Sequence, residues 1–171
     1  MQGHEIEILE ATLKDVEGII KVQQVVWLDT YPNKEIGITY KDVEEQTKQF
    51  NTERLIKKLS DPCRHYWVAK TEGNIIGMLT VSKGEEINTL QALYILPEFQ
   101  DKGVGSKLIK KGLEWLGTEK NVVLGVASYN KNTIEFYKKF GFVEKGERHD
   151  EIATLPSGKV IPEIEMVLSF I

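Results

Sequence analysis

The sequence predicts a single α/β domain, residues 1–171, with a mixed and mostly antiparallel sheet of about seven strands flanked by helices. Two observations predict this class. A strand–helix–strand unit over residues 88–128 makes one strand pair parallel and its crossover right-handed. Short, turn-bounded apolar runs predict the antiparallel strands, which are 65–72, 75–83, 88–96, 142–149 and 160–170.

The N-terminal region predicts one strand followed by a helix. Residues 5–11 alternate between polar and apolar side chains, which indicates a strand. Thr12 with Asp15 three residues later gives a near capping box, and apolar residues at helical spacing continue to Trp27. The segment 30–37 contains Pro and Gly and breaks this helix.

A second helical stretch and a hairpin come next. Thr39 is the expected N-cap of the second stretch, which we expect to continue past Asn51 until Pro62 ends it. The Gly73–Asn74 pair lies between two aromatic and β-branched runs. This pair predicts a tight hairpin turn between the first two meander strands.

The C-terminal half alternates helices with strands. The helix 103–117 presents one apolar face. The run 121–128 is almost entirely apolar, as in a strand buried on both faces. A short helix over 130–140 is expected to end at Gly141, and an LPSGK turn separates the last two strands.

Composition bounds the function class. The chain carries a net charge of −4, which does not favour a nucleic-acid partner. It has no signal-peptide core and no apolar run long enough for a membrane helix. Cys63 is the only cysteine, which excludes an intrachain disulfide and a cysteine-based zinc site. We expect a cytoplasmic protein with no metal, nucleic-acid or membrane partner.

The stretch QDKGVG places Gly103 and Gly105 at the start of a helix. Glycines there let a phosphate approach the free amides of the first turn, although a plain strand-to-helix turn also explains them. The stretch GVGSKL is not a Walker loop, and Leu108 occupies the third-glycine position of a dinucleotide fingerprint. A nicotinamide dehydrogenase is therefore disfavoured.

Two spaced motifs resemble those of the GNAT superfamily of acetyl-CoA-dependent N-acetyltransferases. QDKGVG matches the family's Q/R-x-x-G-x-G/A pyrophosphate loop, and NKNTIEFYKKFGF downstream resembles its N-x-x-A-x-x-F-Y-x-x-x-G-F motif. Thr133 stands where alanine is usual. A helix and a strand separate the motifs, and the expected element order is similar over nearly the whole chain. The resemblance implies the GNAT fold, with a V-shaped slot between the fourth and fifth strands.

The resemblance also implies which residues bind acetyl-CoA, the cosubstrate. The strand backbone would hold the pantetheine arm, and the glycine loop would hold the pyrophosphate. Carried over position by position, the acetyl-CoA-binding residues are Leu93, Tyr94, Ile95, Gln100, Asp101, Lys102, Gly103, Val104, Gly105, Ser106, Asn130, Asn132, Tyr137 and Lys139.

Tyr137 matches the family tyrosine near the thioester sulfur, and its expected role is to protonate the departing thiolate. Some members carry a glutamate base on the fourth strand, where this chain has Asn88, Thr89 and Gln91. The identity of the general base that deprotonates the amine is therefore open. Glu85 and Glu86 are candidate ends of a water path for the proton.

The expected reaction is acetyl transfer to a primary amine by direct attack through a tetrahedral intermediate. Trp27 and Tyr31 are expected to line the acceptor pocket, and Glu86 is also expected to bind the acceptor. The acceptor is a small amine or polyamine, or a protein N-terminus. A non-catalytic acyl-CoA-binding module with the same fold is the alternative, and a homodimer through the last strands follows from the resemblance.

Overall fold

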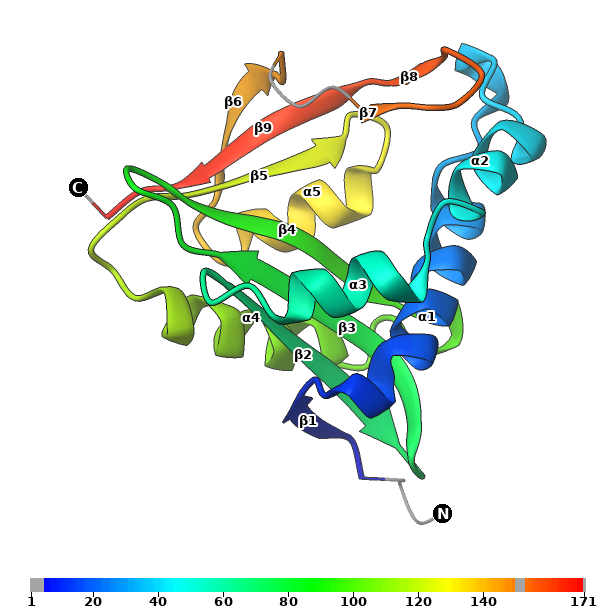
Figure 1. Cartoon of the computed structure of the whole chain (residues 1–171). Helices are drawn as coiled ribbons and strands as arrows, with labels where there is room; N and C mark the ends of the chain where they lie inside the picture. The colour runs from blue at the N-terminus through cyan, green and yellow to red at the C-terminus, as the bar shows by residue number, and fades with distance from the viewer. Residues whose placement is uncertain (1–4, 150–152, 171) are drawn as a thin grey trace.

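The computed structural model describes residues 5–149 and 153–170. Within these residues a seven-stranded sheet has the strand order β1-β2-β3-β4-β5-β9-β6, as Figure 1 shows. Only the β4–β5 pair is parallel among the described pairs. The strands are β1 (Glu7–Glu10), β2 (Arg64–Thr71), β3 (Asn74–Ser82), β4 (Asn88–Ile95), β5 (Val122–Ala127), β6 (Val143–Glu147) and β9 (Glu163–Leu168).

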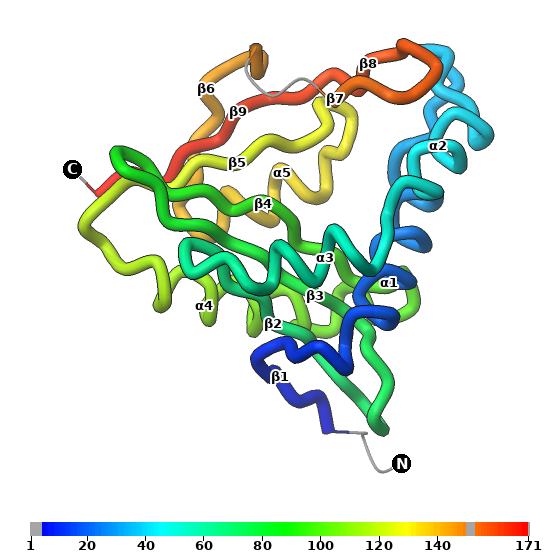
Figure 2. The backbone as a smooth tube through the Cα atoms, viewed as in Figure 1, coloured from blue at the N-terminus to red at the C-terminus, as the bar shows by residue number. Residues whose placement is uncertain are grey.

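Helices cover both faces of this sheet. In Figure 2, α3 passes in front of the β2–β4 strands, whereas α4 and α5 lie behind them. Buried side chains of α1 pack with Val68 and Met78 on one face. On the other face, Leu108 and Ile109 of α4 pack with Leu79. The helices are α1 (Val16–Thr30), α2 (Tyr40–Thr47), α3 (Thr52–Leu59), α4 (Val104–Leu116) and α5 (Lys131–Lys138).

Short polar caps fix where the first helices begin. Thr12 and Asp15 form the expected capping box, in which the Thr12 amide donates to Asp15 Oδ2 at 2.8 Å. A second capping box starts α2 at Thr39. The second helical stretch is not continuous, because Asn51 Oδ1 accepts from the Arg54 amide at 2.9 Å and starts α3 as a separate helix.

The β2–β3 hairpin turns one residue earlier than the sequence predicts. Glu72 and Gly73 are the two turn residues, with φ of +49° and +77°, and Asn74 already belongs to β3. Two positive φ values are typical of a type I′ turn, whose twist matches that of the strands. The expected Gly73–Asn74 turn was therefore wrong by one position.

The last predicted strand is divided in two. Pro162 separates β8 (Val160–Ile161) from β9, and β8 pairs with β7 (Ala153–Thr154) in a small separate hairpin. Proline lacks an amide hydrogen, so a ladder is interrupted there. The Lys159 ammonium contacts Asp42 Oδ2 at 2.7 Å, and this holds the β7–β8 hairpin beside α2, as Figure 1 shows.

The β4–β5 pair separates soon after it starts. Within the described residues, the two strands pair only at Asn88↔Val122 and Thr89↔Val123. From Leu90 to Ile95, β4 keeps its pairing with β3, but its other edge diverges from β5. This divergence is the V-shaped slot expected between the fourth and fifth strands.

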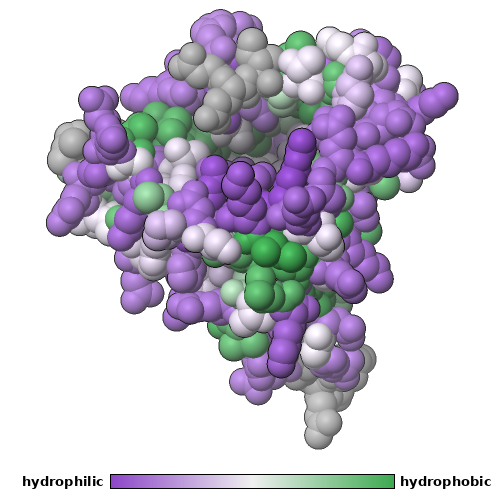
Figure 3. All heavy atoms as spheres, in the orientation of Figure 1, coloured by the Kyte–Doolittle hydropathy of each residue, from purple (hydrophilic) through white to green (hydrophobic). Residues whose placement is uncertain are grey.

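One face of the molecule is mostly polar (Figure 3). Figure 3 shows a largely hydrophilic face with small, separate hydrophobic patches. Over residues 5–149 and 153–170, no helix combines the length and the hydropathy that crossing a membrane requires.

Candidate active site

A cleft of about 780 Å³ opens where β4 and β5 separate. Its loop side is lined by the segment after β4 and by α4 and α5, including Gln100, Asp101, Gly103, Gly105, Ser106, Asn132 and Lys139. Its tyrosine side is lined from α1, β4, β5 and the C-terminal strands by Trp27, Asp29, Tyr31, Tyr94, Tyr129, Arg148 and Glu163. Tyr137 also lines the cleft.

On the loop side, the backbone turns sharply into α4. Asp101 and Gly103 have φ of +58° and +80°, and the Gln100 side-chain amide donates to the Ile95 carbonyl at 3.0 Å. No side chain caps the first turn of α4, and there is open space around Gly103. The amides of that turn and the helix dipole therefore favour an anion such as a phosphate.

Gly103 is needed for its positive φ, whereas Gly105 is needed because space for a side chain is lacking. A Cβ atom at residue 105 would lie 3.3 Å from Cζ of Phe136 on α5. The glycine therefore lets α4 and α5 pack closely. The sequence leaves two explanations for these glycines, a strand-to-helix turn and a phosphate site. The two are compatible, because one loop can both turn the chain into α4 and leave the amides of its first turn open.

Helix α5 presents the second motif to the cleft. Asn130 caps the helix, with Oδ1 accepting from the Thr133 amide at 3.4 Å. Tyr137 is 5% exposed and packs between Phe136 and Phe142, with ring centroids 5.5 and 5.6 Å away. Burial and the nearby Tyr94 raise the pKa of Tyr137 above its ordinary value. The phenol is therefore protonated at neutral pH.

The tyrosine side is a hydrogen-bonded cluster. The Trp27 indole donates to the Tyr94 hydroxyl at 3.1 Å, and the Tyr31 side chain is close enough to Tyr94 to affect its pKa. The Tyr129 hydroxyl donates to the Tyr31 carbonyl at 2.8 Å. Burial and the charge of Glu163 raise the pKa of Tyr129 to about 12. Burial likewise raises the pKa values of Tyr31 and Tyr94.

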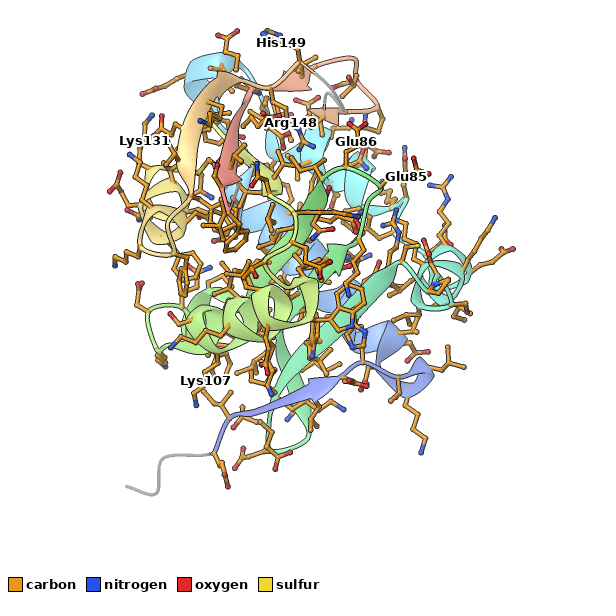
Figure 4. The ribbon with its side chains drawn as sticks, turned by 90° about the vertical axis from the view of Figure 1, so that its left-hand side faces the viewer. Glu85, Glu86, Lys107, Lys131, Arg148 and His149 are labelled. Atoms are coloured by element: carbon orange, nitrogen blue, oxygen red, sulfur yellow. The ribbon has the colours of Figure 1, made fainter. Side chains whose placement is uncertain are left out.

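Two charged residues on the tyrosine side were not selected from the sequence. Arg148 Nη1 lies 3.5 Å from Glu163 Oε2, and the two side chains are 14% and 16% exposed. The Arg148 amide also donates to the Glu163 carbonyl at 2.9 Å. In Figure 4 the Arg148 side chain lies within the fold, whereas His149 points outward.

Most of the residues predicted to form the site share the cleft. Those that line it are Trp27, Tyr31, Leu93, Tyr94, Ile95, Gln100, Asp101, Gly103, Gly105, Ser106, Asn130, Asn132, Tyr137 and Lys139.

Three predicted residues do not line the cleft. The Val104 side chain is buried in the core, so its amide alone is available to a ligand. The Lys102 ammonium lies 5.4 Å from the centre of the Phe99 ring. Glu86 and Glu85 are exposed on the β3–β4 loop (Figure 4). This loop leads into the start of β4, where β4 pairs with β5 and the slot is closed.

A comparison with known families decides what this arrangement is. The model of the acetyltransferase (GNAT) family matches residues 25–142. The chain belongs to the GNAT family. The matched range contains both sequence motifs and the loop side of the cleft, whereas Arg148 and Glu163 lie beyond it.

Relatives of this GNAT chain are distant. The uncharacterized N-acetyltransferase YjgM of Escherichia coli K12 is 28% identical over 163 residues, which cover 91% of this chain and 90% of that protein. The N-acetylaspartate synthetase of Danio rerio is 27% identical over 130 residues, or 74% of this chain. The chain matches 45% of that protein, which is less than half of its length.

A solved structure confirms the GNAT fold. The PaiA N-acetyltransferase of Thermoplasma acidophilum, crystallised in complex with coenzyme A, superposes with a TM-score of 0.78 at 21% identity. The match covers 96% of this chain and 99% of that one. The expected fold class is therefore confirmed, including the mixed seven-stranded sheet.

Proposed function

We propose that this GNAT protein is an N-acetyltransferase that moves acetyl from acetyl-CoA to a primary amine. The main support is one continuous cleft that joins the first turn of α4, the open edge of β4 and Tyr137. A phosphate site, a pantetheine edge and a proton donor are the three parts that this transfer needs.

The residues present fit acetyl-CoA, which when bound supplies an activated acetyl group. The uncapped amides of the first turn of α4 would hold the diphosphate. The backbone of Leu93–Ile95 would pair with the amide-rich pantetheine as an added strand. Lys139 is exposed at the rim and adds positive charge near the phosphates.

The tyrosine side would receive the acceptor. An ordinary alkylamine has a pKa near 10.4, so on the order of one molecule in a thousand is neutral at pH 7. Transfer from water into a mostly buried cleft lowers that pKa because it disfavours the ammonium form. Asp29 and Glu163 are carboxylates on this side of the cleft; they would attract the amine as an ammonium ion and so oppose the lowering of its pKa.

Tyr137 would act as the general acid. Attack by the neutral amine on the thioester carbonyl forms the C–N bond, and the C–S bond then breaks. The nitrogen releases a proton to solvent, and the expelled thiolate needs one. The raised pKa of Tyr137 keeps this phenol protonated at the pH of the reaction, but it also makes the phenol a weaker acid toward the thiolate. A proton donor of this kind typically contributes about 10²–10⁴-fold to the rate.

A panel of amines assayed for release of CoA thiol tests the proposal, with Tyr137→Phe beside the wild type. We expect the variant to lose about 10²-fold or more in kcat with little change in acetyl-CoA affinity. Tyr66→Phe is the matched control. Tyr66 is buried outside the cleft, in the core cluster that α1 forms with Val68 and Met78, called the α1 core below. Equal turnover in the Tyr137 variant would remove the assignment.

The acyl-CoA-binding module is the alternative that the same assay separates. It is favoured by the polar but non-basic side chains of Asn88, Thr89 and Gln91 on β4. Binding of CoA to the wild type with no thiol release from any amine would support it against the transferase.

A further inference from the structure

The tyrosine side of the cleft, which we propose receives the acceptor, carries charges of both signs. The Glu163 carboxylate and the Arg148 guanidinium lie 3.5 Å apart, both mostly buried, and both line the cleft. A charge pair removed from water costs free energy relative to apolar packing, so its place inside a ligand cleft calls for a role in recognition. Because Arg148 offsets the charge of Glu163, the pair attracts the second ammonium group of a polyamine less than an unpaired carboxylate would.

Strand register orders the two charges along the cleft. Thr89 and Val123 are the last described pair of β4 and β5, so Gly125 and Ala127 lie beyond it, toward the open end of the slot. Glu163 is the partner of Ala127 in β9, and Ala127 lies two residues further toward the open end than Gly125. The Arg148 guanidinium lies against Gly125, nearer the closed end, while its Nη1 stays 3.5 Å from Glu163 Oε2.

Gly125 makes room for this arginine. A Cβ atom at Gly125 would collide with Nη1 of Arg148 and would lie 2.8 Å from its Cδ. The guanidinium therefore rests directly against the backbone of β5. A planar guanidinium in a fixed place is suited to bidentate binding of a carboxylate.

The geometry points to an acceptor that is a free amino acid, with its amine at Glu163 and its carboxylate at Arg148. This inference rests on the proposed N-acetyltransferase function. The amine of such an acceptor lies toward Leu93–Ile95, where the thioester is expected, and its carboxylate lies away from it. A peptide N-terminus has an amide in place of that carboxylate and would lose the charge-assisted contact with the Arg148 guanidinium.

The test compares each of the twenty L-amino acids with its own carboxamide, which keeps the amine and the side chain but loses the acid. Binding is measured by calorimetry on the CoA-saturated protein, and transfer is measured by thiol release from acetyl-CoA. For the preferred amino acid we expect about 10²-fold tighter binding than for its amide. Equal affinity of acid and amide across the panel, or binding of neither, would overturn the inference.

Two variants act on Arg148 by different routes. Arg148→Gln removes the charge, and Gly125→Ala displaces the guanidinium while keeping it in the chain. Each should bring the acid-to-amide affinity ratio down by at least tenfold. His149→Gln is the matched control, because that neighbour is exposed and points outward, and it should keep the wild-type ratio.

The outcomes separate this inference from the function on which it rests. Thiol release from amides and polyamines as fast as from amino acids would refute the amino-acid acceptor and leave the transferase in place. Selective, Arg148-dependent binding of an amino acid without any thiol release would support the acceptor site and refute the transferase. Circular dichroism and CoA affinity of each variant show that it is folded, and a wild-type ratio in folded Arg148→Gln would refute the inference.

Discussion

Tyr137 combines burial with a position in the cleft, and both bear on its pH dependence. An exposed tyrosine has a pKa near 10. Burial raises the pKa of Tyr137, and the negative charge that Tyr94 would carry raises it further. A proton donor works in its protonated form, so a raised pKa moves the loss of donor activity to higher pH.

The expected kcat/KM of the wild type therefore rises from pH 6 to about pH 9.5 as the acceptor amine loses its proton, with no falling limb in that range. The measurement is the pH profile of thiol release at subsaturating acceptor. Tyr137→Phe should give a lower profile of the same shape. A wild-type profile that falls between pH 8 and 9.5 while that of the variant does not would contradict the raised pKa.

At this scale, the sequence predicts residues that belong to local motifs better than residues that face each other across the fold. Gly103, Gly105, Asn130 and Tyr137 are at fixed spacings from a helix start, so a motif finds them. Arg148 lies after the end of β6, in a segment without clear alternation, and its partner is fifteen residues further along the chain. Only the antiparallel pairing of β6 with β9 brings them together.

Among the elements, the start of α1 is joined to the sheet through Asp15. Its carboxylate accepts from the Thr12 amide and contacts the Lys70 ammonium of β2 at 2.6 Å, with the Asp15 side chain 5% exposed. Burial alone would raise the pKa of Asp15, but the hydrogen bonds from Lys70 and Thr12 outweigh it, so the pKa is lowered. The ionised carboxylate therefore contributes to stability.

Asp15→Asn is expected to reduce the free energy of unfolding by about 1–3 kcal/mol at pH 7, since it loses a cap and leaves Lys70 without its charged partner. A lowered folded pKa means that this contribution is present above the unfolded pKa of about 3.9 and is lost as pH falls below it. Urea unfolding at pH 7 and pH 3 measures both effects.

The difference between wild type and Asp15→Asn should therefore shrink at pH 3. Lys21→Gln on the exposed face of the same helix, beyond its first turn, is the control and should follow the wild type at both pH values. A difference of the same size at pH 7 and pH 3 would show that the carboxylate charge is not what joins the helix to β2.

The residues at which helices begin are easier to predict from the sequence than the positions of very short strands. The caps at Thr12 and Thr39 depend on side chains within three residues, and both were predicted. The β7–β8 hairpin has strands of two residues, too short to show alternation, and it is held by contacts with residues far away in sequence. Its existence therefore depends on packing that a local pattern does not contain.

For the molecule as a whole, the cleft is a consequence of topology. Two positions of pairing hold β4 and β5 together, and where the strands part, α1 on one face and α4 and α5 on the other line the cleft. The β7–β8 hairpin closes the tyrosine side: Leu155 and Ile161 pack with Ile38 and Val43, while Ala153 lines the cleft. The two sides thus depend on different parts of the core.

Leu155→Ala should therefore affect one side of the cleft. Leu155 is 3% exposed, and its truncation is expected to cost about 2–4 kcal/mol of stability while loosening the hairpin that leads into Glu163. We expect the KM for the acceptor to rise about tenfold, since small displacements of positioning groups weaken binding strongly. The dissociation constant of CoA should stay the same, because the loop side is held by α4 and α5.

Leu55→Ala separates a local effect from general destabilisation. Leu55 is 5% exposed in α3 and belongs to the α1 core, so its truncation should cost similar stability without touching the hairpin. Steady-state kinetics for both substrates, beside thermal unfolding, compares the two variants. An acceptor KM that rises equally in both would mean that overall stability controls the cleft, whereas a rise confined to Leu155→Ala ties acceptor binding to the hairpin.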